Sequence, residues 1–162
     1  MSATPSEDDA EISDGATETC WFCNPAVRVE DPPGGWIHED SSWRVGHGLP
    51  GWGPAGTIIV ESRRHFLDVS DMRPEEAATF GPLLADVVAA VKQVVHADRV
   101  YTWSTMDRFP HLHVWLIPWW KESASRGPEY LVHSLTGVGA NEAEAVDVAT
   151  TMRTLLSGRT VT

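Results

Sequence analysis

The longest periodic segment of the chain runs from Pro74 to about His96, and it constrains the fold more than any other feature. Its apolar residues recur at spacings of three and four, which predicts an amphipathic α-helix with one stripe of side chains to bury. Proline is favoured in a first helical turn, so Pro74 marks the start. The stripe consists of Phe80, Leu83, Leu84, Val87, Val88, Val91, Val94 and Val95. The rest of the chain must supply an apolar layer against which this helix packs.

Short apolar runs on both sides of the helix are typical of β-strands. Three runs precede it, at residues 35–38, 42–45 and 57–60. Two runs follow it, at residues 99–106 and 111–118, and only four residues separate these two. So short a link predicts an antiparallel hairpin.

A last helix is expected to begin after Asn141. Asn141 and Glu144 have the spacing of a capping box, and apolar residues recur at helical spacing after them until Gly158. The order of elements is therefore strands, helix, hairpin and helix. It predicts an α+β domain on an antiparallel sheet, in which the long helix follows the third or fourth strand and a C-terminal helix comes last.

The chain has 162 residues, which suits one domain, and its acidic residues are concentrated at the start. The first 18 residues hold six acids and neither Lys nor Arg, so they carry about half of the net charge of −11. Such a composition cannot bury enough apolar surface to order the chain. We therefore expect residues 1–18 to be a disordered acidic tail and residues 19–162 to form the domain. The tail also differs from a basic, apolar signal peptide, which favours a cytoplasmic location.

Charge and hydropathy also argue against two classes of partner. Arg63, Arg64 and Arg73 are the only close basic cluster, which is too small for a general nucleic-acid binder. No apolar run approaches the roughly 20 residues that a membrane span needs. We therefore expect neither a nucleic acid nor a membrane as a partner.

The two cysteines, Cys20 and Cys23, are too few for a disulfide framework and pose a choice between a metal site and a redox pair. A thioredoxin-like pair would follow a strand and open a helix, whereas this pair follows the acidic tail and precedes Asn24 and Pro25. A zinc finger would need a second ligand pair close by, and the plausible histidine ligands lie far downstream. A metal site would therefore have to be assembled by the fold, and the redox alternative stays open.

Alternation in the run from His111 to Ile117 sorts its side chains between the two faces of a strand. One face carries His111, His113 and Trp115, and the other carries Leu112, Val114 and Leu116. Side chains two apart on a strand stand about 6.5 Å from each other, so one imidazole can ligate a metal while the next faces a substrate. Two half-buried polar residues on a sheet face are the plainer alternative.

Together these residues resemble the histidine triad (HIT) superfamily of nucleotide hydrolases and transferases. Its signature is His-φ-His-φ-His-φ-φ, where φ is apolar, and residues 109–118 match it except that Trp115 replaces the third histidine. The strand, basic turn and histidine at residues 56–65 also match, as does the Cys-x-x-Cys of the zinc-containing branch, so the similarity covers residues 20–118. The resemblance implies a HIT-like fold and, because members are often homodimers, a homodimer as the assembly to test.

In the zinc-containing branch four residues hold the metal, and the matching residues here are Cys20, Cys23, His65 and His111. Two thiolates and two imidazoles complete a tetrahedral site with no open position, so the resemblance implies a structural Zn²⁺. The remaining histidines are expected at the surface or in loops. They are His38, His47, His96 and His133.

The resemblance also assigns the chemistry. His113 matches the nucleophile that attacks the α-phosphorus of a nucleotide, and the backbone carbonyl of His111 matches the acceptor that orients it. The implied substrates are nucleoside phosphoramidates, dinucleoside polyphosphates and related nucleotides. Trp115 departs from the pattern, since an indole can donate a hydrogen bond but cannot shuttle a proton. Trp115 can equally stack on a base or simply pack.

Polar residues just before the motif occupy positions where members often place phosphate contacts. Ser104, Thr105 and Arg108 are therefore candidate substrate-binding residues, with Arg108 as the supporting cation. A solvated arginine in the hairpin is the alternative. Three functions remain open: a nucleotide phosphohydrolase or nucleotidyltransferase that uses His113, a nucleotide-binding module weakened by loss of the third histidine, and a thiol redox protein.

Overall fold

The computed structural model describes residues 17–28 and 30–158. Most of the predicted acidic tail therefore lies outside the described residues. Its last two residues, Thr17 and Glu18, are helical and lead directly into the cysteine segment. The backbone N–H of Cys20 donates to the carbonyl of Thr17 at 3.3 Å.

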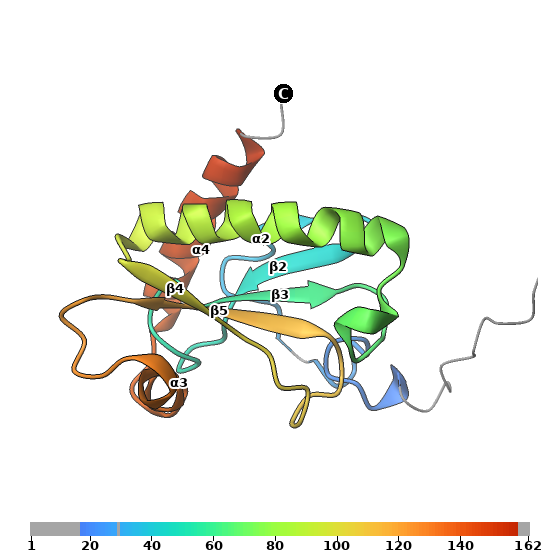
Figure 1. The fold of residues 1–162 in the computed structure, drawn as a ribbon, viewed down its shortest axis with the longest axis horizontal. Helices are drawn as coiled ribbons and strands as arrows, with labels where there is room; N and C mark the ends of the chain where they lie inside the picture. Colours follow the sequence, from blue (N-terminus) through green and yellow to red (C-terminus); the bar gives the residue numbers. More distant parts are fainter. Residues whose placement is uncertain (1–16, 29, 159–162) are drawn as a thin grey trace, which may run out of the picture.

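Five antiparallel strands form the central sheet, in the order β1-β2-β3-β5-β4 (Figure 1). The strands are β1 (His38–Glu39), β2 (Trp43–His47), β3 (Ile58–Ser62), β4 (Arg99–Trp103) and β5 (His113–Trp119). A 3₁₀ turn, η1 (Val69–Asp71), leads into the long helix α2 (Pro74–Val95), which follows the third strand as predicted. The α+β prediction on an antiparallel sheet is confirmed.

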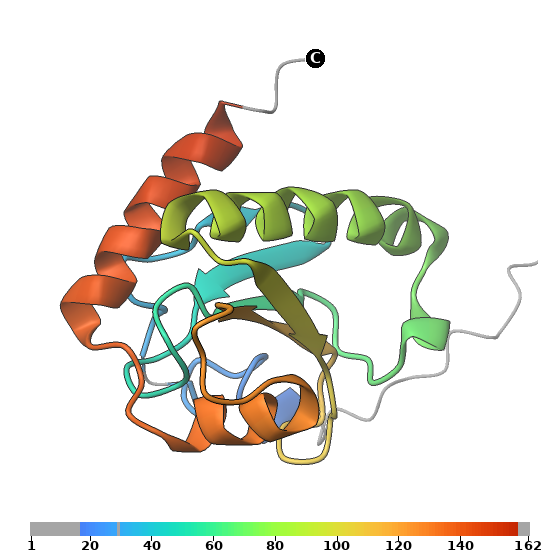
Figure 2. The ribbon, with the colours of Figure 1, turned by 60° about the vertical axis from the view of Figure 1, so that its left-hand side comes forward.

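The helices lie on both sides of this sheet. Helix α2 crosses one face, next to the last helix, α4 (Glu142–Ser157), which also contacts β2. A third helix, α3 (Gly127–Thr136), lies on the opposite side of the sheet from α2 (Figure 2). The predicted cap of the last helix is present, because the Asn141 side chain accepts from the Glu144 N–H and the Glu144 side chain accepts from the Asn141 N–H. The sheet thus has a core face under α2 and a second face under α3.

The main core lies between α2 and the sheet. Val87 and Val91 of the predicted stripe are fully buried, as is Ala90 beside them, and each large apolar side chain buried in this way contributes about 1.5–3 kcal/mol. The sheet supplies the side chains of one face: Val45, Ile58, Val60, Val114 and Leu116. Residues that alternate with these in β3 and β5 point to the other face, where the polar residues of the motif gather.

Helix α2 is apolar over a longer stretch than the sequence analysis recognised when it found no run of membrane-spanning length. After Glu76 only Asp86 and Lys92 are charged, so by length and composition alone this helix could cross a membrane. In the structure it lies on the sheet, and its N-terminal turn is fixed by an ion pair of 2.8 Å between Glu76 and Arg64. The apolar stripe of α2 therefore packs against the sheet in the core of the domain.

The connection between β4 and β5 is longer than the four residues predicted. It spans residues 104–112. Leu112, the residue before β5, forms its backbone hydrogen bonds with Phe66 and Ser62 and not with β4. The N–H of Leu112 donates to the carbonyl of Phe66 at 2.6 Å, and its carbonyl accepts from the N–H of Ser62 at 3.1 Å. These two bonds hold the start of the histidine motif against the end of β3.

Two further details differ from the prediction. The first strand is the short β1 at residues 38–39 instead of 35–38, because a glycine turn occupies residues 34–35 and only the Ile37 N–H bonds to β2 before the ladder starts. Helix α3 was not predicted. Its one buried residue is Tyr130, so it carries no apolar stripe that the periodicity could reveal.

Gly56→Ala should destabilise the fold. Gly56 has φ +92°, and an added Cβ would lie 2.9 Å from the Val95 side chain, so we expect a loss of about 1–3 kcal/mol in the free energy of unfolding. Gly81→Ala is the matched control, since nothing lies within 4 Å of its Cβ position in α2 and it should stabilise by about 0.5–1 kcal/mol. Urea unfolding followed by tryptophan fluorescence measures both. Equal stability of the two variants would contradict this account of Gly56.

Candidate functional site

Four side chains that are far apart in the sequence converge at one end of β3 and β5. The donor atoms of Cys20, Cys23, His65 and His111 all lie within 4.8 Å of one another. Cys20 and His111, which are 91 residues apart, have Sγ and Nδ1 atoms 3.5 Å apart. These are the four residues that the family resemblance assigned to a metal.

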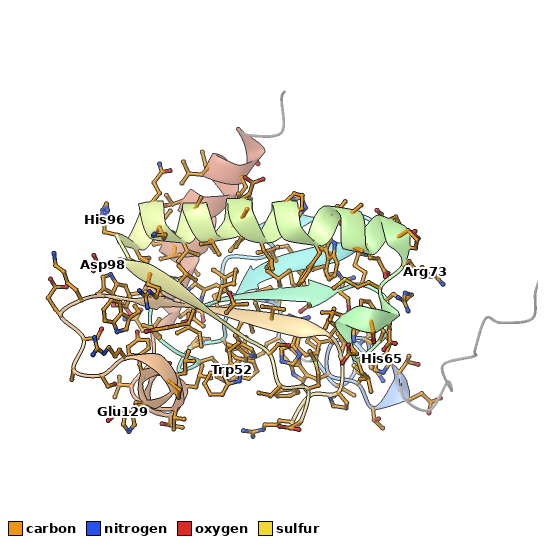
Figure 3. All side chains as sticks on the ribbon, in the orientation of Figure 1. Trp52, His65, Arg73, His96, Asp98 and Glu129 are labelled. Carbon is orange, nitrogen blue, oxygen red and sulfur yellow. The ribbon has the colours of Figure 1, made fainter. Side chains whose placement is uncertain are left out.

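Local structure explains this convergence. The cysteines lie in a tight turn, in which the N–H of Cys23 donates to the carbonyl of Cys20 at 3.2 Å. His65 follows the end of β3, and His111 precedes β5. Because β3 and β5 are neighbours in the sheet, their ends bring the two imidazoles together, and Figure 3 shows His65 on the side of the sheet away from α2.

The spacing of the donor atoms suits a tetrahedral cation. Ligands about 2.0–2.3 Å from a tetrahedral zinc lie about 3.3–3.8 Å from one another. The Nδ1 of His111 lies 3.3 Å from the Sγ of Cys23 and 3.3 Å from the Nδ1 of His65, and the Cys23 Sγ lies 3.5 Å from the latter nitrogen. The cluster therefore has the donor types and the dimensions of a closed metal site.

Hydrogen bonding fixes which nitrogen of His111 faces the cluster. Its Nε2–H donates to the carbonyl of Ser62 at 2.7 Å, which leaves Nδ1 as the lone-pair donor. Burial lowers the pKa of His111 to about 4, so the ring is neutral near pH 7, as a ligand must be. Such a partner behind the ligand is the arrangement that orients histidines in metal sites.

His113, two residues after His111, is held in a defined tautomer. Its Nδ1–H donates to the backbone carbonyl of His111 at 2.7 Å, as the resemblance implied. No described residue forms a hydrogen bond with Nε2, which therefore carries the lone pair. Burial lowers the pKa of His113, so this lone pair persists near neutral pH. The ring of Phe22, from between the two cysteines, packs on His113 with centroids 4.7 Å apart.

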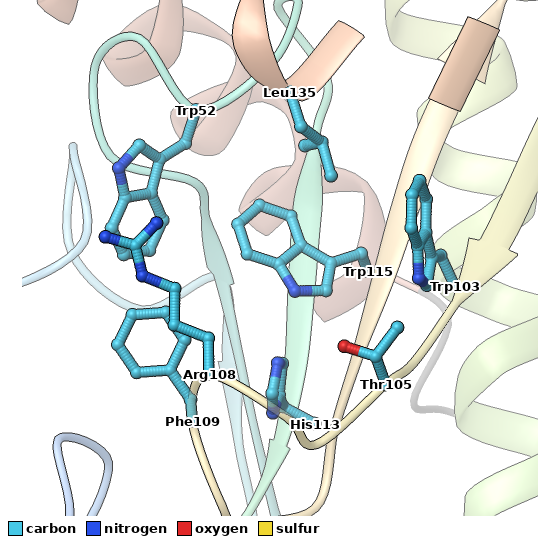
Figure 4. A pocket seen from close by; sticks show the side chains of 8 residues that line it. All are labelled: Trp52, Trp103, Thr105, Arg108, Phe109, His113, Trp115 and Leu135. Atoms are coloured by element: carbon cyan, nitrogen blue, oxygen red, sulfur yellow. The ribbon is translucent and has the colours of Figure 1, made fainter. Parts of the chain in front are cut away.

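A pocket of about 240 Å³ opens beside His113 (Figure 4). Aromatic rings form most of its wall, and the centroids of Trp52 and Trp115 lie 5.6 Å apart. Its lining residues are Trp52, Trp103, Thr105, Arg108, Phe109, His113, Trp115 and Leu135. The pocket is thus apolar, with His113 at one end.

The predicted substrate-binding residues fall into two groups. Thr105 and Arg108 line the pocket, together with Trp115. The hydroxyl of Ser104 instead donates to the backbone carbonyl of His113 at 2.5 Å, and Ser104 lines a different cavity with Leu112 and Val114. Ser104 therefore supports the strand that carries His113 and does not face the pocket.

Sequence reasoning missed four of the residues that line the pocket, namely Trp52, Trp103, Phe109 and Leu135. Trp52 comes from the glycine-rich loop after β2, which is fastened to the segment before α4, since the N–H of Ala140 donates to the carbonyl of Gly53 at 2.8 Å. Trp103 ends β4, and Leu135 comes from the unpredicted α3. The high number of tryptophans, eight in the chain, was the one signal available, but which of them lie together depends on the fold.

A buried ion pair behind the cysteine turn was also missed. Arg28 Nη1 lies 2.8 and 2.9 Å from the two carboxylate oxygens of Glu61, which is 1% exposed. Arg28 also stacks on Trp21, 4.3 Å from the ring centroid, and on Trp36 at 4.6 Å. Burial raises the pKa of Glu61 to about 7 despite its cationic partner. This pair ties the cysteine segment to β3, directly opposite His113 in the sheet register.

One of the remaining histidines corrects the prediction. His47 was expected at the surface or in a loop, but it lies in β2 and is 3% exposed. Its Nδ1–H donates to the carbonyl of Gly48 at 2.8 Å, and its Nε2 accepts from the N–H of Gly56 at 2.9 Å. A neutral imidazole thus closes the loop that carries Trp52. His96 and His133 are exposed, as expected.

Among the comparisons with known proteins, only the comparison of structures found matches to this chain. No protein-family model matches it, and a search of curated proteins found no match. A hypothetical histidine triad nucleotide-binding protein from Sulfolobus tokodaii is 18% identical over 86% of this chain and 93% of its own, with a TM-score of 0.64. A histidine triad protein from Sinorhizobium meliloti is 16% identical over 80% and 92%, with a TM-score of 0.62. The chain has the histidine triad fold.

The zinc branch of the resemblance has a structural counterpart. A Zn-bound histidine triad family protein from Mycobacterium smegmatis is 19% identical over 88% of this chain and 99% of its own, with a TM-score of 0.59. The Cys/His cluster of the present HIT-fold chain fits that branch. The resemblance stated from the sequence is therefore confirmed for the fold.

His47→Gln should weaken the pH dependence of stability. Burial lowers the pKa of His47 in the folded state, so the unfolded chain takes up this proton first as the pH falls. The free energy of unfolding should therefore decrease below about pH 6.5, and the decrease should be smaller in His47→Gln. Denaturant unfolding between pH 5 and 8 checks this, with the exposed His133→Gln as control. Identical slopes in wild type and His47→Gln would contradict it.

Proposed function

We propose that this chain is a nucleotide phosphohydrolase or nucleotidyltransferase that acts at the α-phosphate through a covalent nucleotidyl-His113 intermediate. One observation carries the proposal: the His111 carbonyl fixes the Nδ1–H of His113, and the nucleophilic Nε2 belongs to a ring that lines the pocket. The substrate class comprises nucleoside phosphoramidates, dinucleoside polyphosphates and related nucleotides. Support comes from the fold and from one structural neighbour, the Sulfolobus tokodaii protein, which is described as a nucleotide-binding protein.

The reaction consists of two displacements. The Nε2 lone pair of His113 attacks the α-phosphorus, a P–N bond forms, and the bond to the leaving group breaks with its electron pair. Water or another acceptor then attacks phosphorus, the P–N bond breaks, and the lone pair returns to Nε2 while the acceptor loses a proton. The His111 carbonyl stabilises the positive ring of the intermediate through Nδ1–H, and Arg108 is the cation on the pocket wall that faces phosphate charge.

Trp115 favours a second candidate function. Without the third histidine the site is also compatible with a nucleotide-binding module whose catalysis is weak. A thiol redox role has less support, because burial and Cys20 raise the pKa of Cys23 to about 12 and Cys20 is itself buried. Without a bound metal, a thiol of this kind forms little thiolate near neutral pH.

We also propose that the metal of the Cys20, Cys23, His65 and His111 cluster is a structural Zn²⁺. When bound, it would supply a cross-link between the N-terminal turn and the central sheet, with no open position for chemistry. His111 then serves both sites, because its ring faces the metal and its carbonyl faces His113.

Protein purified without chelator should contain one equivalent of zinc, and Cys20→Ser should lose it. Because a structural metal stabilises only the folded chain, we expect Cys20→Ser to lower the free energy of unfolding by about 3 kcal/mol or more. Elemental analysis and thermal melting measure the two effects, with His133→Ala as a control that keeps its metal. An intact Cys20–Cys23 disulfide in the native protein would overturn the metal site and revive the redox function.

His113→Asn should abolish the covalent intermediate. An Asn side chain can still donate to the His111 carbonyl, but its amide nitrogen has no nucleophilic lone pair, so turnover should fall by about 10³-fold or more. Intact-mass analysis after mixing with adenosine phosphoramidate or diadenosine polyphosphates shows the adduct directly. The exposed His133→Asn should form the adduct like wild type. An adduct that persists in His113→Asn would show that another residue is the nucleophile.

A further inference from the structure

The pocket contains the indole of Trp115 at the position where a general acid would protonate the leaving group. Trp115 lies two residues after His113 on β5, so both side chains project from the same face of the sheet. Figure 4 shows the indole nitrogen of Trp115 on the ring edge that is nearer to His113. An indole N–H donates a hydrogen bond but does not release its proton near neutral pH.

None of the described residues that line the pocket can replace a general acid. Arg108 keeps its proton throughout the physiological range. The only other titratable residue in the lining is His113, whose proton is held on Nδ1 by the His111 carbonyl while Nε2 bonds to phosphorus. The ring of His111 is 1% exposed and bonds to Ser62, so it does not reach the pocket.

The shape of the pocket indicates where the leaving group lies. An in-line displacement places the leaving group opposite the attacking Nε2. In Figure 4, Trp115 and then Leu135 lie beyond His113, and Trp52 and Trp103 stand on the two sides. A leaving group that occupies the side of the pocket away from His113 would lie among aromatic side chains, which favour a flat apolar group.

Charge narrows the class further. Arg108 is the one charged side chain among the described residues of the lining. It can balance one phosphodiester charge, whereas a polyphosphate chain would bring several negative charges into an apolar slot without partners. The slot thus suits a substrate with a single anionic phosphoryl group.

We propose that the substrate is a nucleoside 5′-monophosphate esterified to a planar aromatic alcohol, and that the leaving group departs as an aryloxide without a proton from the protein. This inference rests on the proposed function and narrows its substrate class to esters with an acidic aromatic leaving group. The Nε2–P bond forms as the P–O(aryl) bond breaks, the electron pair leaves on the aryl oxygen, and solvent protonates that oxygen afterwards. Acidic leaving groups are therefore required, and alkyl amines, which must be protonated to leave, are poor substrates.

The test compares two adenosine 5′-monophosphate esters that differ only in the acidity of the phenol: the 4-nitrophenyl ester and the phenyl ester. A general acid is worth about 10²–10⁴-fold for a poor leaving group. The wild-type pocket lacks a general acid, so the wild-type protein should cleave the 4-nitrophenyl ester at least about 10²-fold faster than the phenyl ester. Trp115→His restores an ionisable group and should raise the phenyl ester rate by about 10–10²-fold, narrowing the ratio.

Trp103→His is the matched control, because it makes the same change on a side wall of the pocket and should not narrow the ratio. Equal rates of wild type on the two esters, or equal narrowing by both variants, would overturn the inference. So would an adduct on His113 from adenosine phosphoramidate but from neither aryl ester, and in that case the proposed function stands. If intact-mass analysis finds no adduct with esters, phosphoramidate or diadenosine polyphosphates, the proposed function itself fails.

Discussion

The convergence of two thiols and two imidazoles is the constraint on which the rest of the functional face depends. The cysteine turn has no strand pairing with the sheet, so its position is set by this cluster, by the Arg28–Glu61 pair and by the packing of Phe22. The same turn covers one side of the His113 ring. The Cys/His cluster, His113 and the pocket therefore follow one another along one face of the sheet, while the apolar core under α2 occupies the other face.

Features set by local pattern could be predicted from the sequence. The stripe of α2, the cap at Asn141 and the alternation after His111 each depend on neighbours along the chain, and the structure has all three. The four cluster residues were found through the family motif, because spacing alone cannot bring together residues 91 positions apart. The comparisons support the fold behind that motif, and the proposed chemistry rests on the geometry around His113.

The pocket could not be predicted, and a one-residue register difference shows why. A four-residue link at 107–110 would have paired Thr102 with Trp115, whereas the longer connection pairs Trp103 with Trp115. A shift of one residue moves every side chain of a strand to the other face. A hairpin with the four-residue link would therefore place Trp103 on the opposite face from Trp115, away from the pocket. Trp52 and Leu135 depend on a loop and a helix placed by tertiary contacts alone.

The buried pair of Arg28 and Glu61 limits how this chain can evolve. Loss of Glu61 leaves the guanidinium of Arg28 without its carboxylate, and loss of Arg28 leaves Glu61 only the longer contact to Arg44 at 3.9 Å. Breaking a buried pair in this way costs about 3–5 kcal/mol, whereas replacing both partners by well-packed apolar residues can be nearly neutral. A sequence that has changed only one of the two positions is therefore less stable than both the original sequence and the double replacement. Arg28 and Glu61 are thus expected to be inherited, or lost, as a unit.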